Sequence, residues 1–350
     1  ANYNTAVGAY TLDANTTGDN NIAIGRSALG INISGASNTA VGTFALDANT
    51  TADNNTAVGY ASLSANTTGI HNTCVGNASG DAITTASYNT GMGSGALGTN
   101  ILSGANVAVG QDALASHNVA SAANGYNTAV GTNAGAAVTT GTLNTLIGGG
   151  SGDSITTGSN NTFLGYNTGT ALTTGSNMLF IGVDAGNSGS PGGSWIGQSN
   201  AIVLGDENVT DCYIQADWNI ASDQRDKTDF TALDLGLDFV KALAPVTYKW
   251  DKRSKYGDKT APDYDLLAQT PDGTHKEDWL DIGFKAQEVE ALEIAAGYDK
   301  DNKTNLTTSH GADGKQMSLQ YSKFVPILVK AIQEQNALIE ALTARITTLE

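Results

Sequence analysis

The sequence predicts a mainly β protein, with a parallel β-solenoid of 17-residue repeats over residues 1–205 and an α+β domain after it. Three observations predict this division. The motif Asn-x-x-x-Gly recurs at a fixed spacing in the first part only. That part has one cationic side chain, Arg26, and eight acidic ones, whereas residues 206–350 have 16 Lys and Arg and 26 Asp and Glu. An apolar heptad pattern closes the chain and predicts a long C-terminal helix.

The repeat glycines define the coils of the predicted solenoid. They are Gly8, Gly25, Gly42, Gly59, Gly76, Gly93 and Gly110, then, after an insertion near residues 117–125, Gly131, Gly148, Gly165 and Gly182, with a stretched last copy ending at Gly205. One copy is too short and polar to bury a core, so the copies must stack. Asparagine at one fixed place predicts a ladder of side-chain amides. About twelve coils at roughly 4.8 Å each predict a rod of about 55 Å.

Two columns of the repeat predict how each strand faces. The residue before each repeat glycine is apolar, as in Val7 and Ile24, and we expect it to point inward. The residue two before the glycine is mostly Ala early and becomes Leu146, Phe163 and Phe180 late. Side chains alternate along a strand, so we expect this second column to point outward, against neighbouring subunits. The alternative is that it lines a layer within one chain.

The repeats resemble the β-roll heads of trimeric autotransporter adhesins, whose copies also read Asn-x-Ala-Val/Ile-Gly. The resemblance covers about residues 1–205. It implies trimers and an adhesive role at a surface. The 17-residue coil is longer than the usual head repeat, which leaves the handedness open.

Composition excludes several classes of function. A formal charge of −17 disfavours nucleic acid and anionic membranes as partners. No uninterrupted apolar run is long enough to span a membrane, so no membrane insertion is expected. Two cysteines cannot form a disulfide framework, and Cys74 occupies a slot that Ala fills elsewhere, which predicts a small buried residue.

No cofactor and no metal are expected, because the four histidines lack ligand spacing. The stretch 93–98 matches a dinucleotide fingerprint, but it lies inside a β-repeat with no helix after it. Six aspartates recur near turns, where we expect them to solvate the surface or cap turns, with a sugar-binding face as the alternative. They are Asp13, Asp47, Asp81, Asp112, Asp153 and Asp184.

The second part carries four landmarks in order: the run from Ala221 to Lys227, Pro245–Trp250, Gly283–Val289 and Phe324–Glu334. This succession resembles the C-terminal intramolecular chaperones of phage tailspikes and tail fibres, the endosialidase-type family of self-cleaving serine peptidases. The resemblance covers about residues 218–350. It implies a domain that guides the folding of trimeric β-structured fibres and then cuts itself off.

The same resemblance implies a Ser-Lys dyad in which Ser222 is the nucleophile and Lys227 the general base. The scissile bond would join Ala221 to Ser222, with Asp223 and Arg225 in supporting roles. The alternative is an exposed polar linker in which the serine and the lysine have no catalytic role.

The dyad sets two physical conditions. A free lysine is protonated at neutral pH, so burial must favour its neutral form. The nearby carboxylates of Asp223, Asp226 and Asp229 oppose this unless they are turned away or paired with Arg225. Five residues of separation also place the two side chains on different faces of a strand or helix, so the dyad needs a turn or two chains. Activity could therefore wait for assembly.

The predicted terminal helix, about residues 322–350, has apolar positions spaced alternately by four and three: Leu328, Ile332, Gln335, Ile339, Leu342, Ile346 and Leu349. Ile at a and Leu at d ordinarily favour two strands. The family resemblance implies three strands, and Gln335 adds a polar layer, so we expect a homotrimer.

These observations predict a fragment of a phage tail fibre or spike in the virion, assembled in the host cytoplasm. Residues 1–205 would form the shaft or head, residues 206–221 a junction and residues 222–350 the self-cleaving chaperone. A glycan or a protein on the host surface could be its receptor. The alternative is a bacterial trimeric surface adhesin with a trimerisation domain that does not cleave. Because the chain opens inside the pattern, we expect it to be the C-terminal piece of a longer protein.

Overall fold

The computed structural model describes residues 1–119, 123–215, 218, 220–259, 261, 263–298 and 306–349. The chain divides into two compact units, Ala1–Asn208 and Val209–Glu350. Within the predicted junction 206–221, residues 216, 217 and 219 lie outside the described residues, as does the final residue of the predicted helix.

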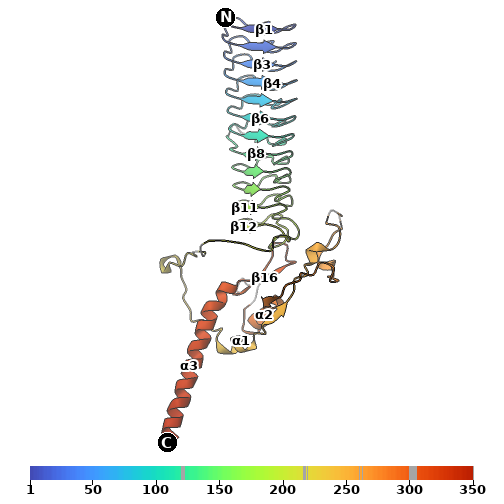
Figure 1. The fold of residues 1–350 in the computed structure, drawn as a ribbon. Helices are drawn as coiled ribbons and strands as arrows, with labels where there is room; N and C mark the ends of the chain where they lie inside the picture. The colour runs from blue at the N-terminus through green and yellow to red at the C-terminus, as the bar shows by residue number, and fades with distance from the viewer. Residues whose placement is uncertain are drawn as a thin grey trace. The chain divides into compact units, whose positions relative to one another are not determined.

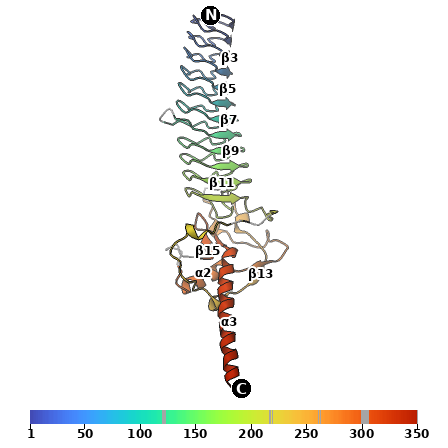
Figure 2. The same cartoon turned by 90° about the vertical axis from the view of Figure 1, so that its left-hand side faces the viewer.

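The first unit is a parallel β-solenoid in which twelve strands form one sheet in chain order (Figure 1). The strands are β1 Thr5–Val7, β2 Ile22–Ile24, β3 Thr39–Val41, β4 Thr56–Val58, β5 Thr73–Val75, β6 Thr90–Met92, β7 Val107–Val109, β8 Thr128–Val130, β9 Thr145–Ile147, β10 Thr162–Leu164, β11 Met178–Ile181 and β12 Ala201–Leu204. Equivalent positions of successive copies pair, as Ala23 does with Ala40. Figure 2 shows the same strands one above the other. The predicted solenoid of 17-residue coils is confirmed.

The predicted facing of the two strand columns is wrong. Ala23 and Ala40 are completely buried inside one chain, and so are Phe163 and Phe180. The residue before the repeat glycine points outward instead, and Ile24 is 39% exposed. Alternation fixes only that the two columns face opposite ways, so the sequence could not tell which side the coil encloses. The column from Ala23 to Phe180 therefore lines the interior of one chain, and the aliphatic column forms the outer face of the sheet.

The predicted asparagine ladder is present and buried. Asn38 donates from its backbone N to Asn21 Oδ1 at 2.9 Å, and Asn55 repeats the bond to Asn38 at 2.9 Å. A second ladder was missed, because its residues were assigned to polar turns. Asn32 Nδ2 donates to Asn15 Oδ1 at 3.0 Å, and Asn49 Nδ2 to Asn32 Oδ1 at 2.9 Å. Each coil thus satisfies buried polar groups by bonding the next coil.

The repeat glycine is required by both space and backbone angle. Gly42 has φ +140°, and a Cβ there would lie 2.2 Å from the carbonyl oxygen of Gly59 in the next coil. No other residue fits such a position.

Cys74 is a fully buried free thiol, as predicted, and burial raises its pKa to about 12. It serves packing rather than reactivity.

The second unit is built from short elements. They are η1 Gln224–Asp226, α1 Leu237–Ala242, β13 Val246–Tyr248, η2 Arg253–Lys255, η3 Leu266–Ala268, β14 Asp281–Gly283, α2 Ala286–Ala295, β15 Thr308–His310, β16 Met317–Leu319, η5 Tyr321–Lys323 and α3 Phe324–Leu349. β13 pairs with β14 and β15 with β16, both antiparallel. Leu235, Phe239, Val289, Phe324 and Ile327 form the core of this unit. The predicted α+β class of this part is confirmed.

Helix α3 packs only at its beginning, where Phe324, Ile327 and Ala331 are buried. The later heptad positions are exposed, with Ile339 at 53% and Ile346 at 58%. The predicted helix is confirmed, while its pairing with other chains stays a prediction. Among the described helices, none is both long and apolar enough to cross a membrane.

Candidate self-cleavage site

A single 3₁₀ turn shapes the chain around Ser222. Asp223 caps the turn η1, because its Oδ1 accepts a hydrogen bond from the backbone N of Arg225 at 2.9 Å. Lys227 closes the turn by donating its backbone N–H to the carbonyl of Gln224 at 3.2 Å. A short capping side chain followed by one turn is a common way to reverse the direction of a chain.

This turn brings the two predicted catalytic residues together within one chain. Lys227 Nζ donates to Ser222 Oγ at 2.6 Å and to the Ser222 carbonyl oxygen at 3.3 Å. The turn alone is therefore sufficient to bring Ser222 and Lys227 into contact. The contact places an amine against the hydroxyl, which is the geometry that a general base needs.

The supporting residues pair with each other. Arg225 donates from Nε to both carboxylate oxygens of Asp223 at 3.1 Å and from an η nitrogen to Oδ2 at 2.5 Å. These bonds hold the pKa of Asp223 below its usual value and raise that of Arg225. The carboxylate of Asp223 is thus paired with Arg225. This is one of the two arrangements, turned away or paired, in which it would not oppose a neutral lysine.

The condition of burial is not met within one chain. Every residue from Ala221 to Lys227 is exposed. Lys227 therefore contacts Ser222 where both side chains are open to water. Burial of this contact would need a covering surface from outside the turn.

Comparison with known proteins finds a family match that begins at this turn. Residues 222–298 match the family model described as the chaperone of endosialidase. The matched segment thus starts at Ser222 and lies inside the second unit. Together with the solenoid, it fits a phage tail fibre with a C-terminal intramolecular chaperone of a self-cleaving family. No match was found among curated proteins or among solved structures.

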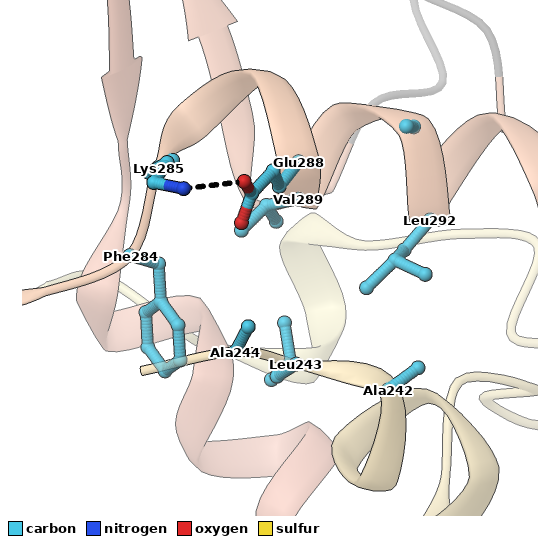
Figure 3. A pocket seen from close by; sticks show the side chains of 9 residues that line it. Ala242, Leu243, Ala244, Phe284, Lys285, Glu288, Val289 and Leu292 are labelled. Atoms are coloured by element: carbon cyan, nitrogen blue, oxygen red, sulfur yellow. Dashed lines mark hydrogen bonds and ion pairs between the residues drawn. The ribbon is translucent and has the colours of Figure 1, made fainter. Parts of the chain in front are cut away.

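The matched segment also contains an apolar cavity of about 280 Å³ between helix α2 and the end of α1 (Figure 3). Leu243, Phe284 and Leu292 line it. Lys285 Nζ lies 2.7 Å from Glu288 Oε1 at its edge. The sequence analysis named residues 283–289 as a family landmark but predicted no cavity.

A buried carboxylate in the same segment was missed by the sequence analysis. Glu293 of α2 is completely buried and accepts hydrogen bonds from the backbone N of Leu306, Thr307 and Thr308 and from the hydroxyls of both threonines. Burial raises the pKa of Glu293, but the hydrogen bonds from Thr308 and Thr307 outweigh burial and leave the pKa lowered. The sequence did contain a signal for this buried carboxylate, because Glu293 is a charged residue within the apolar run 291–295.

Three further pairs of titratable groups lie among the described residues of the second unit. His310 Nε2 lies 2.6 Å from Glu290 Oε1, and Lys315 Nζ lies 2.7 Å from Asp265 Oδ1. Tyr298 donates to Asp234, and this bond raises the pKa of Tyr298 to about 12. Within the described ranges, no group of three or more His, Cys, Asp or Glu side chains is placed to hold a metal ion.

Proposed function

We propose that residues 222–350 guide the solenoid into a homotrimer and then cut the chain between Ala221 and Ser222. The observation that carries this proposal is the 2.6 Å contact between Lys227 Nζ and Ser222 Oγ. The start of the family match at Ser222 supports the position of the cut. The proposed roles are Ser222 as nucleophile and Lys227 as general base, with the Asp223–Arg225 pair holding the turn.

The position of the nucleophile determines the chemistry. Ser222 lies directly after the bond to be cut, so its Oγ attacks the carbonyl carbon of Ala221. The Oγ proton passes through Lys227 to the departing amine of Ser222 as the C–N bond breaks. Ala221 is then held as an ester on Ser222, and water hydrolyses that ester to a free carboxylate and a free hydroxyl.

Assembly supplies the missing condition in this proposal. A neighbouring copy that covers the exposed turn would remove water from Lys227 and favour its neutral amine. The cut would then follow trimer formation and would report that the solenoid has folded.

Two outer surfaces support a parallel trimer. The outward column of the solenoid, which includes Ile24, Met92 and Ile181, offers apolar side chains along one face of the sheet. The exposed heptad positions of α3 offer a second apolar surface. Partner chains on both surfaces would remove this area from water. Light scattering of Ser222→Ala, which stays whole, should give three times the chain mass, and a monomer at micromolar concentration would contradict the trimer.

We further propose that the assembled particle belongs to a virion and attaches it to a host surface. The family match and the solenoid support a tail-fibre role. The direct test of cleavage is the mass of the freshly purified chain, which should appear as two pieces, residues 1–221 and 222–350. A chain that stays whole after trimer assembly would favour a permanent trimerisation domain, as in the adhesin alternative.

A further inference from the structure

Three side chains from successive coils form a group on the surface of the solenoid, which we call the Arg26 cluster: Arg26, Phe44 and Tyr60. Arg26 and Tyr60 are exposed, and Phe44 is half-buried. The Arg26 guanidinium carbon lies 4.5 Å from the centroid of the Phe44 ring. The Phe44 and Tyr60 rings meet edge to face, with centroids 6.1 Å apart. Phe44 donates its backbone N–H to the Arg26 carbonyl at 3.0 Å, so the coils are adjacent. The cluster is an aromatic surface beside a cation.

The backbone disfavours Phe44 at its position. Its φ is +62°, in the left-handed region that bulky side chains resist. The equivalent residues in other coils are mostly small or polar: Tyr10, Ser27, Ala61, Ala78, Gly95, Asp112, Asn133, Gly150, Asn167 and Asp184. Leu46 also has a positive φ, but it is completely buried in the core. Phe44 is only half-buried and has less of that compensation, and such unfavourable backbone angles tend to persist at functional positions.

The charged group of Arg26 stays available. Within the described part of the chain, its guanidinium makes no hydrogen bond or ion pair with a protein group. It is also the one cationic side chain in residues 1–205. A guanidinium over an aromatic ring still has N–H groups that the ring does not use, and these can bind a carboxylate through two parallel bonds.

We propose that the Arg26 cluster binds an oligosaccharide that carries a single carboxylated sugar. Arg26 would bind the carboxylate, while Phe44 and Tyr60 would stack against the apolar C–H face of a sugar ring. The eight acidic residues of the solenoid repel a polymer of many negative charges, so the ligand carries one. This inference rests on the proposed attachment to a host surface and chooses a glycan over a protein receptor.

The test uses the full chain and immobilised oligosaccharides in matched pairs that differ by one carboxylated sugar: glucuronic acid, galacturonic acid or sialic acid. The wild type should bind at least one acidic member and not its neutral counterpart. Arg26→Gln and Phe44→Ser should each weaken this binding by about tenfold or more, the loss of one charge-assisted or stacking contact. Ser27 occupies the column of Phe44, so Phe44→Ser suits the backbone.

The matched control is Tyr166→Thr, which removes another exposed tyrosine from the solenoid and should leave binding unchanged. Equal binding of acidic and neutral members, or equal binding by wild type and Arg26→Gln, would overturn the proposal. If Phe44→Ser lowers the mass of the particle, the cluster is a contact between copies and the proposal is wrong. A gel of the same preparations reports cleavage separately, so failure of glycan binding is distinguishable from failure of the proposed cleavage.

Discussion

The ring of Phe163 occupies the space that a side chain at position 169 would need: a Cβ on Gly169 would lie 2.3 Å from Phe163 Cε2. Gly186 and Phe180 have the same relationship one coil later, also at 2.3 Å. In early coils the sizes are reversed, since Ala23 accompanies the buried Leu29. The coil interior is therefore filled by pairs of residues whose sizes compensate.

This compensation predicts a coupled pair of substitutions. Gly169→Leu should destabilise the solenoid by about 2–4 kcal/mol, from overpacking and from φ +66°. The double variant Phe163→Ala, Gly169→Leu copies the pair Ala23 and Leu29 and should recover more than half of the loss. Thermal unfolding of the two single variants and the double variant measures this coupling. Strict additivity of the losses would contradict paired packing.

His117 predicts a pH dependence of the solenoid. It is completely buried, its Nε2 lies 3.0 Å from Ser103 Oγ, and burial lowers its pKa to about 4. The same histidine binds a proton more readily in the unfolded chain than in the folded one. The share of the folding stability that depends on neutral His117 is therefore fully present near neutral pH. That share falls as pH drops below about 6.5, by up to about 3 kcal/mol near pH 4.

The matched variant is His117→Asn, because Asn100 fills the same column one coil earlier. Melting temperatures measured between pH 7.5 and 4.5 should fall more steeply for the wild type than for this variant. Parallel pH profiles for the two proteins would show that His117 is protonated equally in the folded and unfolded chains.

Glu293 predicts a stability effect in the second unit. Glu293→Gln replaces one accepting oxygen with an amide that donates toward the backbone N–H groups of residues 306–308. A buried mismatch of donors should cost about 2–4 kcal/mol. Denaturant unfolding followed at residues of this unit should show the loss, with Glu340→Gln on the exposed part of α3 as the neutral control. A change below about 0.5 kcal/mol would contradict the assigned hydrogen bonds.

The fixed spacing of the repeats was sufficient to predict the solenoid, its strand positions and the Asn21–Asn38 ladder. It did not determine which side of the strand is enclosed, because Ala23 and Ile24 alternate equally well in either orientation. Size compensation between Phe163 and Gly169 was readable in the sequence and would have corrected this. Glu293 was not predicted, because its partners at 306–308 become neighbours only when β15 packs on α2.

The proposed chemistry predicts that an ester intermediate can be trapped. Hydroxylamine attacks esters much faster than amides, so it should speed the release of residues 1–221 and leave a hydroxamate on Ala221. Mass spectrometry of that fragment identifies the modification. Ser222→Ala should show no effect of hydroxylamine, and a wild-type fragment that ends only in a carboxylate would contradict the ester.

The central claim is that Ser222 and Lys227 cut the chain that carries them. The most direct test is a denaturing gel of freshly expressed wild type, Ser222→Ala and Lys227→Arg, with Lys241→Ala as a control for an exposed lysine near the turn in sequence. Lys227→Arg keeps the positive charge but removes a base that can become neutral. We expect cleavage in the wild type and in Lys241→Ala, with a new N-terminus at Ser222, and intact chains in the other two. Equal cleavage in wild type and Ser222→Ala would contradict the account.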